Sequence, residues 1–248
     1  ASIRPSSVVY DRADSAITSA LPDEFDFDEI FKDADLFHVS GITPVLSEEA
    51  KELTFAALKK AREHHVKISF DLNYRSKLWT SGVEEKQKML SEMMEYVDIC
   101  FGNARDAAKC LGYSEDGVDF INGDYSICVD ENHMRNVLNH YHFSHLITTL
   151  RNSISASDNG WSGAVCTSED YYKGRDYMLH IVDRVGGGDS FASGFLHGIL
   201  SDMGSRKSLE FGLASAAIKH TIPGDLNYMN ESEVLAMVES DGAGRVQR

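Results

Sequence analysis

The sequence is poor in cysteine and proline. Its 248 residues include only four of each. The cysteines, at positions 100, 110, 128 and 166, form no Cys-x-x-Cys pair, which argues against a thiolate metal site. A chain of this length can bury a core without disulfides, so we expect reduced thiols and a cytoplasmic location.

Positive charge and long apolar runs are also scarce. Lysine and arginine number 24 against 39 aspartates and glutamates, a formal net charge of −15. A protein that binds nucleic acid needs a basic face, and this balance argues against one. No apolar run approaches the ~20 residues that cross a membrane. We therefore expect neither nucleic acid nor a membrane among its partners.

The most informative stretch present is a run of three glycines at 186–188 that ends at Asp189. Apolar residues then recur at Phe191, Phe195 and Ile199, which is the spacing of a helix with one apolar face. The glycines should therefore precede a helix, where free N–H groups and the helix dipole attract an anion such as phosphate. Asp189 would repel that anion unless it accepts a proton from an attacking hydroxyl. An ordinary glycine turn with a first-turn acid is the structural alternative.

Other familiar loops are absent from the sequence. It contains no Gly-x4-Gly-Lys-[Ser/Thr] pattern, and Phe191 stands where a dinucleotide-binding loop would need a third glycine. No Gly-x-Ser-x-Gly motif surrounds Ser190 or Ser193. The glycine run is therefore neither a Walker loop nor a hydrolase nucleophile turn.

Helix and strand signals alternate along the chain. Short apolar runs predict strands at 8–10, 36–40, 66–72, 98–101, 145–150 and within 161–182. Helical spacing predicts helices near 47–58, 89–94, 103–112, 134–141, 190–203 and 208–221, with a short one from 231. This order predicts an α/β fold with a doubly wound, mainly parallel sheet flanked by helices. We expect one domain over residues 1–248, with a loose tail at about 240–248.

The glycine run lies within Asp-Arg-Val-Gly-Gly-Gly-Asp-Ser-Phe-Ala-Ser-Gly at 183–194, which resembles the C-terminal signature of the ribokinase-like (PfkB) carbohydrate kinases. The more usual loop reads Gly-Ala-Gly-Asp, with alanine in place of Gly187. The resemblance extends from about residue 4 to about residue 238. Further segments are similar to the 2-keto-3-deoxygluconate kinases of that family, namely residues 10–13, 71–75, 78–79, 102–107 and 220–225.

The resemblance implies a kinase that uses ATP and Mg²⁺. Asp189 would be the catalytic base, and the N–H groups of Gly186, Gly187 and Gly188 would hold phosphoryl oxygens and the phosphates of ATP. The family's nucleotide loop falls at 148–155, after a strand. Nucleotide binding is thereby assigned to Asn73, Thr149 and Arg151, and indirect, water-mediated binding of Mg²⁺ to Asn103 and Asp106.

The resemblance also implies an acidic sugar, 2-keto-3-deoxygluconate, phosphorylated at its terminal (C6) hydroxyl. The substrate positions of this branch match Tyr10, Arg12, Arg75 and Asp225. Residues two apart in an extended chain share a face, so we expect Asp71, Asn73 and Arg75 to point into one cleft. The guanidinium of Arg75 matches a carboxylate in shape and charge.

Each assignment has an alternative. Arg75 could be a surface arginine paired with an acid, Asn103 and Asp106 an N-cap and a first-turn acid, and Asp225 a turn residue. Another ribokinase-like activity, such as a fructokinase, ribokinase or nucleoside kinase, would also fit the signature. So would a non-catalytic sugar-binding relative or an inactive fragment.

Ribokinase-like kinases normally carry a strand, a di-glycine sugar-binding loop and much of a β lid before the point where this chain starts. We therefore expect the chain to lack an N-terminal segment, with residues near 1–15 as a remnant of the lid and substrate region. Because family members commonly pair through the lid, we also expect a homo-oligomer.

Overall fold

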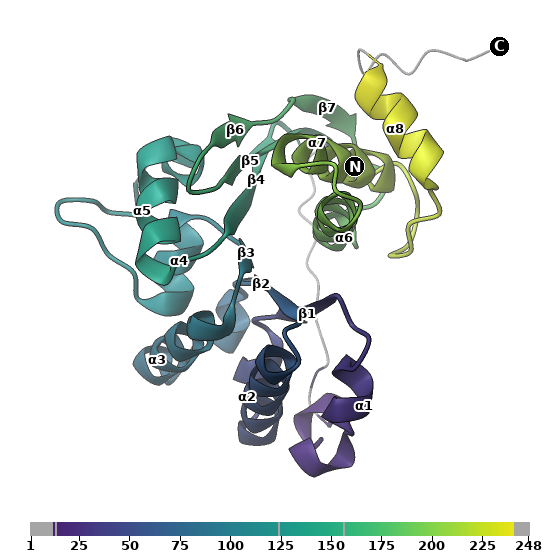
Figure 1. The fold of residues 1–248 in the computed structure, drawn as a ribbon. Coiled ribbons are helices and arrows are strands. Elements are labelled where there is room, and N and C mark those ends of the chain that lie inside the picture. Colours follow the sequence, from purple (N-terminus) through teal and green to yellow (C-terminus); the bar gives the residue numbers. More distant parts are fainter. Residues whose placement is uncertain (1–11, 13, 124, 156, 241–248) are drawn as a thin grey trace. The chain divides into compact units, whose positions relative to one another are not determined.

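The computed structural model describes residues 12, 14–123, 125–155 and 157–240 (Figure 1). They divide into two compact units. Among the described residues, the N-terminal unit comprises 12–148 and 166–170, and the C-terminal unit comprises 149–165 and 171–240. The expected single domain over residues 1–248 stays a prediction.

The strands of the N-terminal unit pair in parallel, in the order β1 (Leu36–Ser40), β2 (Lys67–Asp71), β3 (Ile99–Phe101) and the first half of β4 (His145–Ser153). Ser40 is in register with Asp71, and Asp71 with Phe101. The carboxyl ends of β1, β2 and β3 therefore lie in one row. Ile68, Ser69 and Phe70 of β2 are fully buried, as expected for an inner parallel strand covered on both faces.

Helix α1 (Phe27–Phe31) precedes β1. The helices that connect the strands are α2 (Glu48–Glu63), α3 (Val83–Met93), α4 (Ala104–Leu111) and α5 (Glu131–Tyr141). Short 3-10 turns lie at Ala16–Thr18, Pro22–Glu24, Thr43–Val45, Ser76–Leu78, Met94–Tyr96 and Tyr125–Val129. The predicted start of α2 is confirmed, because the Ser47 hydroxyl accepts the Ala50 N–H at 3.0 Å. The methionine-rich segment fills the core as expected, with Met93 and Met94 almost fully buried.

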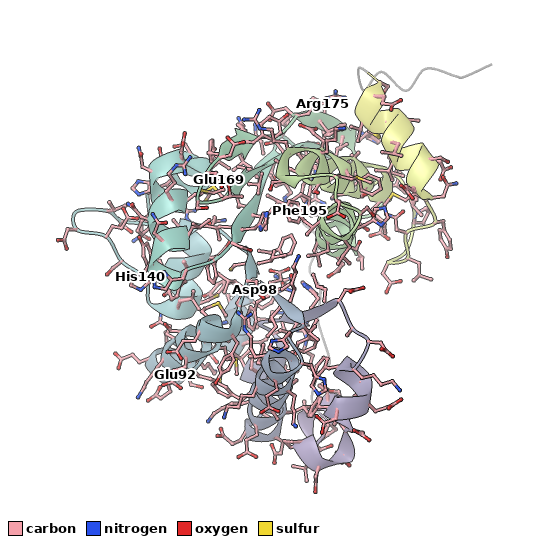
Figure 2. The ribbon with its side chains drawn as sticks, viewed as in Figure 1. Glu92, Asp98, His140, Glu169, Arg175 and Phe195 are labelled. Atoms are coloured by element: carbon pink, nitrogen blue, oxygen red, sulfur yellow. The ribbon has the colours of Figure 1, made fainter. Side chains whose placement is uncertain are left out.

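The C-terminal unit contains the rest of β4, then β5 (Asp158–Cys166), β6 (Tyr171–Lys173) and β7 (Tyr177–His180). β4, β5 and β6 are neighbours in sheet order, and β7 pairs with β5 in the antiparallel sense. Its helices are α6 (Gly187–Leu200), α7 (Ser205–Lys219) and α8 (Glu231–Glu239). Arg175, labelled in Figure 2, lies between β6 and β7. Its guanidinium donates to the Ser240 and Val238 carbonyls at 2.6 and 3.2 Å, and so links the β6–β7 connection to the end of α8.

The predicted fold class is confirmed, since the chain is a mixed α/β protein with a mainly parallel sheet and flanking helices (Figure 1). The four cysteines are free and buried. α6 and α7 each begin three residues earlier than predicted, directly after glycines at 186 and 204. The expected strand at 8–10 and most of the expected tail lie outside the described residues.

Candidate active site

The glycine run lies where a loop becomes α6 in the C-terminal unit. Gly186 is the N-cap residue, with φ of 76°, a left-handed conformation that favours glycine. The Gly187 N–H donates to the Arg184 carbonyl at 3.3 Å. Among the described residues, the N–H groups of Gly188 and Asp189 have no backbone partner. They are open donors at the positive end of the helix dipole, and the sequence had not singled out the N–H of Asp189.

The space in front of this loop is open. A Cβ added to Gly188 would meet nothing within 4 Å. The Asp189 side chain is exposed in the first turn of α6, and its carboxylate forms no hydrogen bond or ion pair with any part of the chain that the structure describes. Its lone pairs are thus available to a hydroxyl group that approaches the helix end.

The turn at 222–225 packs against this loop. A Cβ on Gly186 would lie 2.4 Å from the Asp225 carbonyl oxygen, so only glycine fits there. Asp183 joins the two segments, because its carboxylate accepts the Val185 N–H at 3.0 Å and the Gly224 N–H at 2.9 Å. These two hydrogen bonds lower the pKa of Asp183, and the one from the Val185 N–H has the larger effect. The structure therefore brings Asp225 and the glycine run together.

Lys219 supports the same turn and had not been expected as part of a site. It is the last residue of α7 and has no exposed surface. Its Nζ donates to the Gly224 carbonyl at 2.6 Å and to the Ile222 carbonyl at 3.1 Å. In the sequence, Lys219 is a lysine in the last turn of a predicted helix, shortly before a Pro-Gly pair. That pattern by itself predicts only a cation that interacts with the helix dipole.

His220 lies directly behind the glycine run and had likewise not been singled out. Its Nδ1 is 2.6 Å from the Ala216 carbonyl; a carbonyl only accepts, so Nδ1 carries the proton. A Cβ on Gly187 would lie 2.6 Å from Cε1 of this ring. Burial lowers the pKa of His220 and so favours the neutral ring.

In the N-terminal unit, polar side chains gather at the carboxyl ends of the parallel strands, where ligands bind in such sheets. The Asn73 amide donates to the Ser40 hydroxyl at 3.0 Å, and the Asn103 amide lies 3.3 Å from the Thr148 hydroxyl. These side chains come from strand ends that are distant in sequence. The structure therefore brings polar side chains of neighbouring strand ends into contact.

The extended path expected for residues 71–75 is wrong. β2 ends at Asp71, whose carboxylate accepts the Asn73 N–H at 2.9 Å, and Asn73 has φ of 43°. This local Asx-type turn breaks the alternation of side chains. Arg75 is exposed, and its guanidinium donates to the carbonyl of Tyr74 at 3.0 Å.

Asn103 and Asp106 form a capping box at the start of α4. The Asn103 side chain accepts the Asp106 N–H at 3.0 Å, and Asp106 accepts the Asn103 N–H at 3.2 Å. The expected N-cap and first-turn acid are thus present, and the assignment of Mg²⁺ binding to these residues stays a prediction. Burial raises the pKa of Asp106, and weaker attraction to Lys109, Arg105 and Arg75 opposes it.

The predicted nucleotide loop at 148–155 is largely strand, which corrects that expectation. β4 continues to Ser153, so Thr149 and Arg151 lie on the strand itself. Beyond the strand, the Ser155 hydroxyl donates to the Asp158 carboxylate at 2.8 Å.

Two further expectations concern residues near the start of the chain. Arg12 is described and half-buried, outside any helix or strand. Tyr10 lies outside the described residues.

In the described ranges, no group of three or more His, Cys, Asp or Glu side chains could hold a metal ion. No helix in those ranges is both long and apolar enough to span a membrane.

Comparison with known proteins shows similarity to sugar-acid kinases. The family model for "pfkB family carbohydrate kinase" matches residues 4–232. A 2-dehydro-3-deoxygalactonokinase of Haloferax volcanii is 32% identical over 241 residues, covering 97% of this chain and 68% of the relative. A 2-dehydro-3-deoxygluconokinase of Bacillus subtilis is 28% identical over 230 residues, covering 92% of this chain and 63% of the relative. The chain thus spans about two thirds of the length of these relatives.

Solved structures agree. The structure of the 2-dehydro-3-deoxygluconokinase of Thermotoga maritima matches with a TM-score of 0.87 and 42% sequence identity. The match covers 97% of this chain and 70% of the Thermotoga chain. A putative ribokinase II of Escherichia coli, in complex with ATP and Mg²⁺, shares the fold with a TM-score of 0.69 at 17% identity, and covers 88% of this chain and 62% of its own. The site agrees with these similarities, because a glycine run begins α6 and ends in the exposed Asp189. The chain belongs to the pfkB family of carbohydrate kinases, phosphotransferases with an alcohol group as acceptor.

Proposed function

We propose that this chain phosphorylates the terminal (C6) hydroxyl of 2-keto-3-deoxygluconate, also called 2-dehydro-3-deoxygluconate, with ATP as the donor. The observation that carries the proposal is the N-terminus of α6, where the N–H groups of Gly188 and Asp189 have no backbone partner among the described residues and the carboxylate of Asp189 is exposed. The 42% identity to the Thermotoga maritima 2-dehydro-3-deoxygluconokinase supports the choice of substrate.

In the proposed reaction, the sugar hydroxyl oxygen forms a bond to the γ-phosphorus while the bond from that phosphorus to ADP breaks. The hydroxyl proton passes to the Asp189 carboxylate, and ADP leaves. A carboxylate is too weak a base to ionise an alcohol beforehand, but the loose transition state of phosphoryl transfer needs a proton acceptor only late. Positioning and charge stabilisation therefore supply most of the rate enhancement.

The glycine run would stabilise the transferred group. The N–H groups of Gly188 and Asp189 are open, and the α6 dipole adds partial positive charge at the same end. Gly188 has no neighbour within 4 Å of a Cβ position, which leaves room for phosphoryl oxygens. We assign the Gly187 N–H a smaller share because it donates to the Arg184 carbonyl at 3.3 Å.

The described residues fit a metal ion that arrives with the nucleotide better than one held in a protein cage, because no three-ligand cluster is found among them. Bound Mg²⁺ would neutralise charge on the phosphates of ATP. Asn103 and Asp106 are the candidates to hold it through water. One carboxylate oxygen of Asp106 accepts the Asn103 N–H. The other has no hydrogen-bond partner in the described part of the chain.

The sugar acid needs a cationic partner for its carboxylate. Arg75 is the candidate, because its guanidinium is exposed and, within the described residues, hydrogen-bonds only to the carbonyl of Tyr74. By resemblance, Tyr10, Arg12 and Asp225 would contact the sugar, and Asn73, Thr149 and Arg151 the nucleotide. Because the Haloferax volcanii relative is named for the galactonate epimer, 2-keto-3-deoxygalactonate is the second candidate substrate.

The test is a coupled ADP-release assay of the purified protein with ATP. The panel comprises both keto-deoxy sugar acids, fructose, ribose and adenosine. We expect turnover with the keto acids at a kcat/KM at least about 100-fold above that with neutral sugars, because a neutral sugar offers no carboxylate to the Arg75 guanidinium.

Asp189→Asn is the matched control. It should bind ATP and sugar acid nearly as the wild type does, with kcat lower by about 100-fold to 10,000-fold, the usual contribution of a general base. Product analysis by ³¹P and ¹³C NMR would locate the phosphate at C6. A preference for a neutral sugar, or wild-type turnover by Asp189→Asn, would contradict the proposal.

A further inference from the structure

Lys219 is buried in a way that its packing alone does not explain. It has no exposed surface, yet within the described ranges its ammonium forms no ion pair and is held only by the carbonyls of Ile222 and Gly224. Removing an ammonium group from water is costly, and an apolar side chain of similar length would fill the volume without that cost. The charge therefore has a purpose beyond filling space.

The ammonium lies close to the start of α6. The Cε atom of Lys219 is 3.4 Å from the position that a Cβ would take on Gly186, and the Asp225 carbonyl oxygen is 2.4 Å from it. Gly224 is held from two sides, because its carbonyl accepts from Lys219 at 2.6 Å and its N–H donates to Asp183 at 2.9 Å. Lys219 and Asp183 together clamp the turn against the glycine run.

The carbonyl groups of this turn create an electrostatic problem that Lys219 solves. Carbonyl oxygens at residues 222, 224 and 225 place negative partial charge beside the helix end where an anion would bind. In a buried setting such dipoles act strongly, because little water screens them. An ammonium bound to two of these carbonyls offsets them and keeps the potential at the α6 terminus positive.

We propose that Lys219 is a positioning residue for phosphoryl transfer. Its ammonium holds the 222–225 turn against Gly186 and offsets the carbonyl dipoles of that turn. The open N–H groups of Gly188 and Asp189 thereby keep the place and the potential that a transferred phosphoryl group requires. This role rests on the kinase activity proposed above, and it assigns Lys219 no contact with substrate.

The experiment replaces the charge and then restores it. In Lys219→Met, we expect kcat to fall by about 100-fold with KM for ATP within roughly threefold, the pattern of lost transition-state stabilisation. In Lys219→Ala, added ammonium or propylammonium should restore turnover as its concentration rises, whereas tetramethylammonium, which has no N–H donor, should not. An unchanged kcat in Lys219→Met, or no recovery with either donor amine, would overturn the proposal.

A matched control separates this role from general stability. Val234 of α8 is buried in the same unit and touches neither the turn nor the glycine run in any contact described above. Val234→Ala should lower the melting temperature comparably to Lys219→Met while leaving kcat near the wild-type value. Equal losses of turnover in the two variants would assign Lys219 a purely structural role and overturn the proposal.

Amide hydrogen exchange gives a readout that does not depend on the sugar. Lys219→Met should exchange faster than the wild type at residues 184–189 and 222–225, and Val234→Ala should not. If the wild type phosphorylates no keto acid, the proposed substrate fails, and the exchange rates still decide the role of Lys219. Unchanged exchange at both segments would overturn that role.

Discussion

Gly187 illustrates how one distant side chain can determine which residue a loop accepts. The related kinases usually have alanine at this position, and nothing in the backbone of Gly187 excludes it, because its φ is not in the left-handed region. The obstacle is the His220 ring, whose Cε1 would lie 2.6 Å from the added methyl. Gly187 and His220 therefore form a complementary pair.

We predict that Gly187→Ala lowers the free energy of unfolding by about 1–3 kcal/mol, the usual cost of overpacking. His220→Ala should relieve the clash, so the double variant should be more stable than the sum of the two single losses by about 1 kcal/mol or more. Urea denaturation of the four proteins measures this coupling. Additive losses would mean that the ring and the methyl do not compete for the same space.

At the level of elements, α6 and α7 approach closely because glycines of α6 face small residues of α7. A Cβ on Gly194 would lie 2.6 Å from the Ser215 hydroxyl, and one on Gly198 would lie 2.7 Å from the Cα of Ser208. Phe195, labelled in Figure 2, is fully buried on the same helix. The close contact of these helices brings the end of α7, with Lys219, to the start of α6.

We predict that Gly198→Ala destabilises the protein by about 1–3 kcal/mol, because the backbone of Ser208 cannot move aside as a side chain could. This loss should exceed the gain of about 1 kcal/mol that alanine brings to a helix interior. Gly188→Ala, also on α6, meets nothing within 4 Å and should leave the melting temperature almost unchanged. A stabilised Gly198→Ala would show that the two helices can separate without cost.

At the scale of the whole molecule, acid sensitivity should arise from buried histidines as well as from carboxylates. Burial lowers the pKa of His145 in the N-terminal unit and of His220 in the C-terminal unit. A group whose pKa is lower in the folded state adds stability above its unfolded pKa, near 6.5 for histidine, and loses it as the pH falls. The carboxylates that give the chain its net charge of −15 become protonated mainly near pH 4, below the range in which histidines titrate.

We predict that the free energy of unfolding falls between pH 7 and pH 5.5. Each of these histidines should contribute a slope of up to about 1.4 kcal/mol per pH unit. His145→Gln should reduce the slope. Urea denaturation at several pH values measures it, and equal slopes in the wild type and His145→Gln would exclude His145 as a source of acid sensitivity.

Much of the fold could be predicted because its signals are local. The strand at 66–72, the helix start near 47 and the helix end near 112 were predicted from a few neighbouring residues, and each prediction was confirmed. The errors were also local in origin. Asn73 adopts a left-handed conformation that no spacing rule anticipates, and β4 extends to Ser153, past its predicted end at residue 150.

The sequence alone was sufficient for the order of strands and helices and for a glycine run that begins a helix and ends in Asp189, since both depend on neighbours along the chain. The surroundings of that loop depend instead on residues that become neighbours when α6 packs against α7. That packing places the Asp225 carbonyl against Gly186, His220 behind Gly187, and the buried ammonium of Lys219 beneath the turn. Burial and dipole orientation are properties of these long-range contacts, which no local spacing encodes.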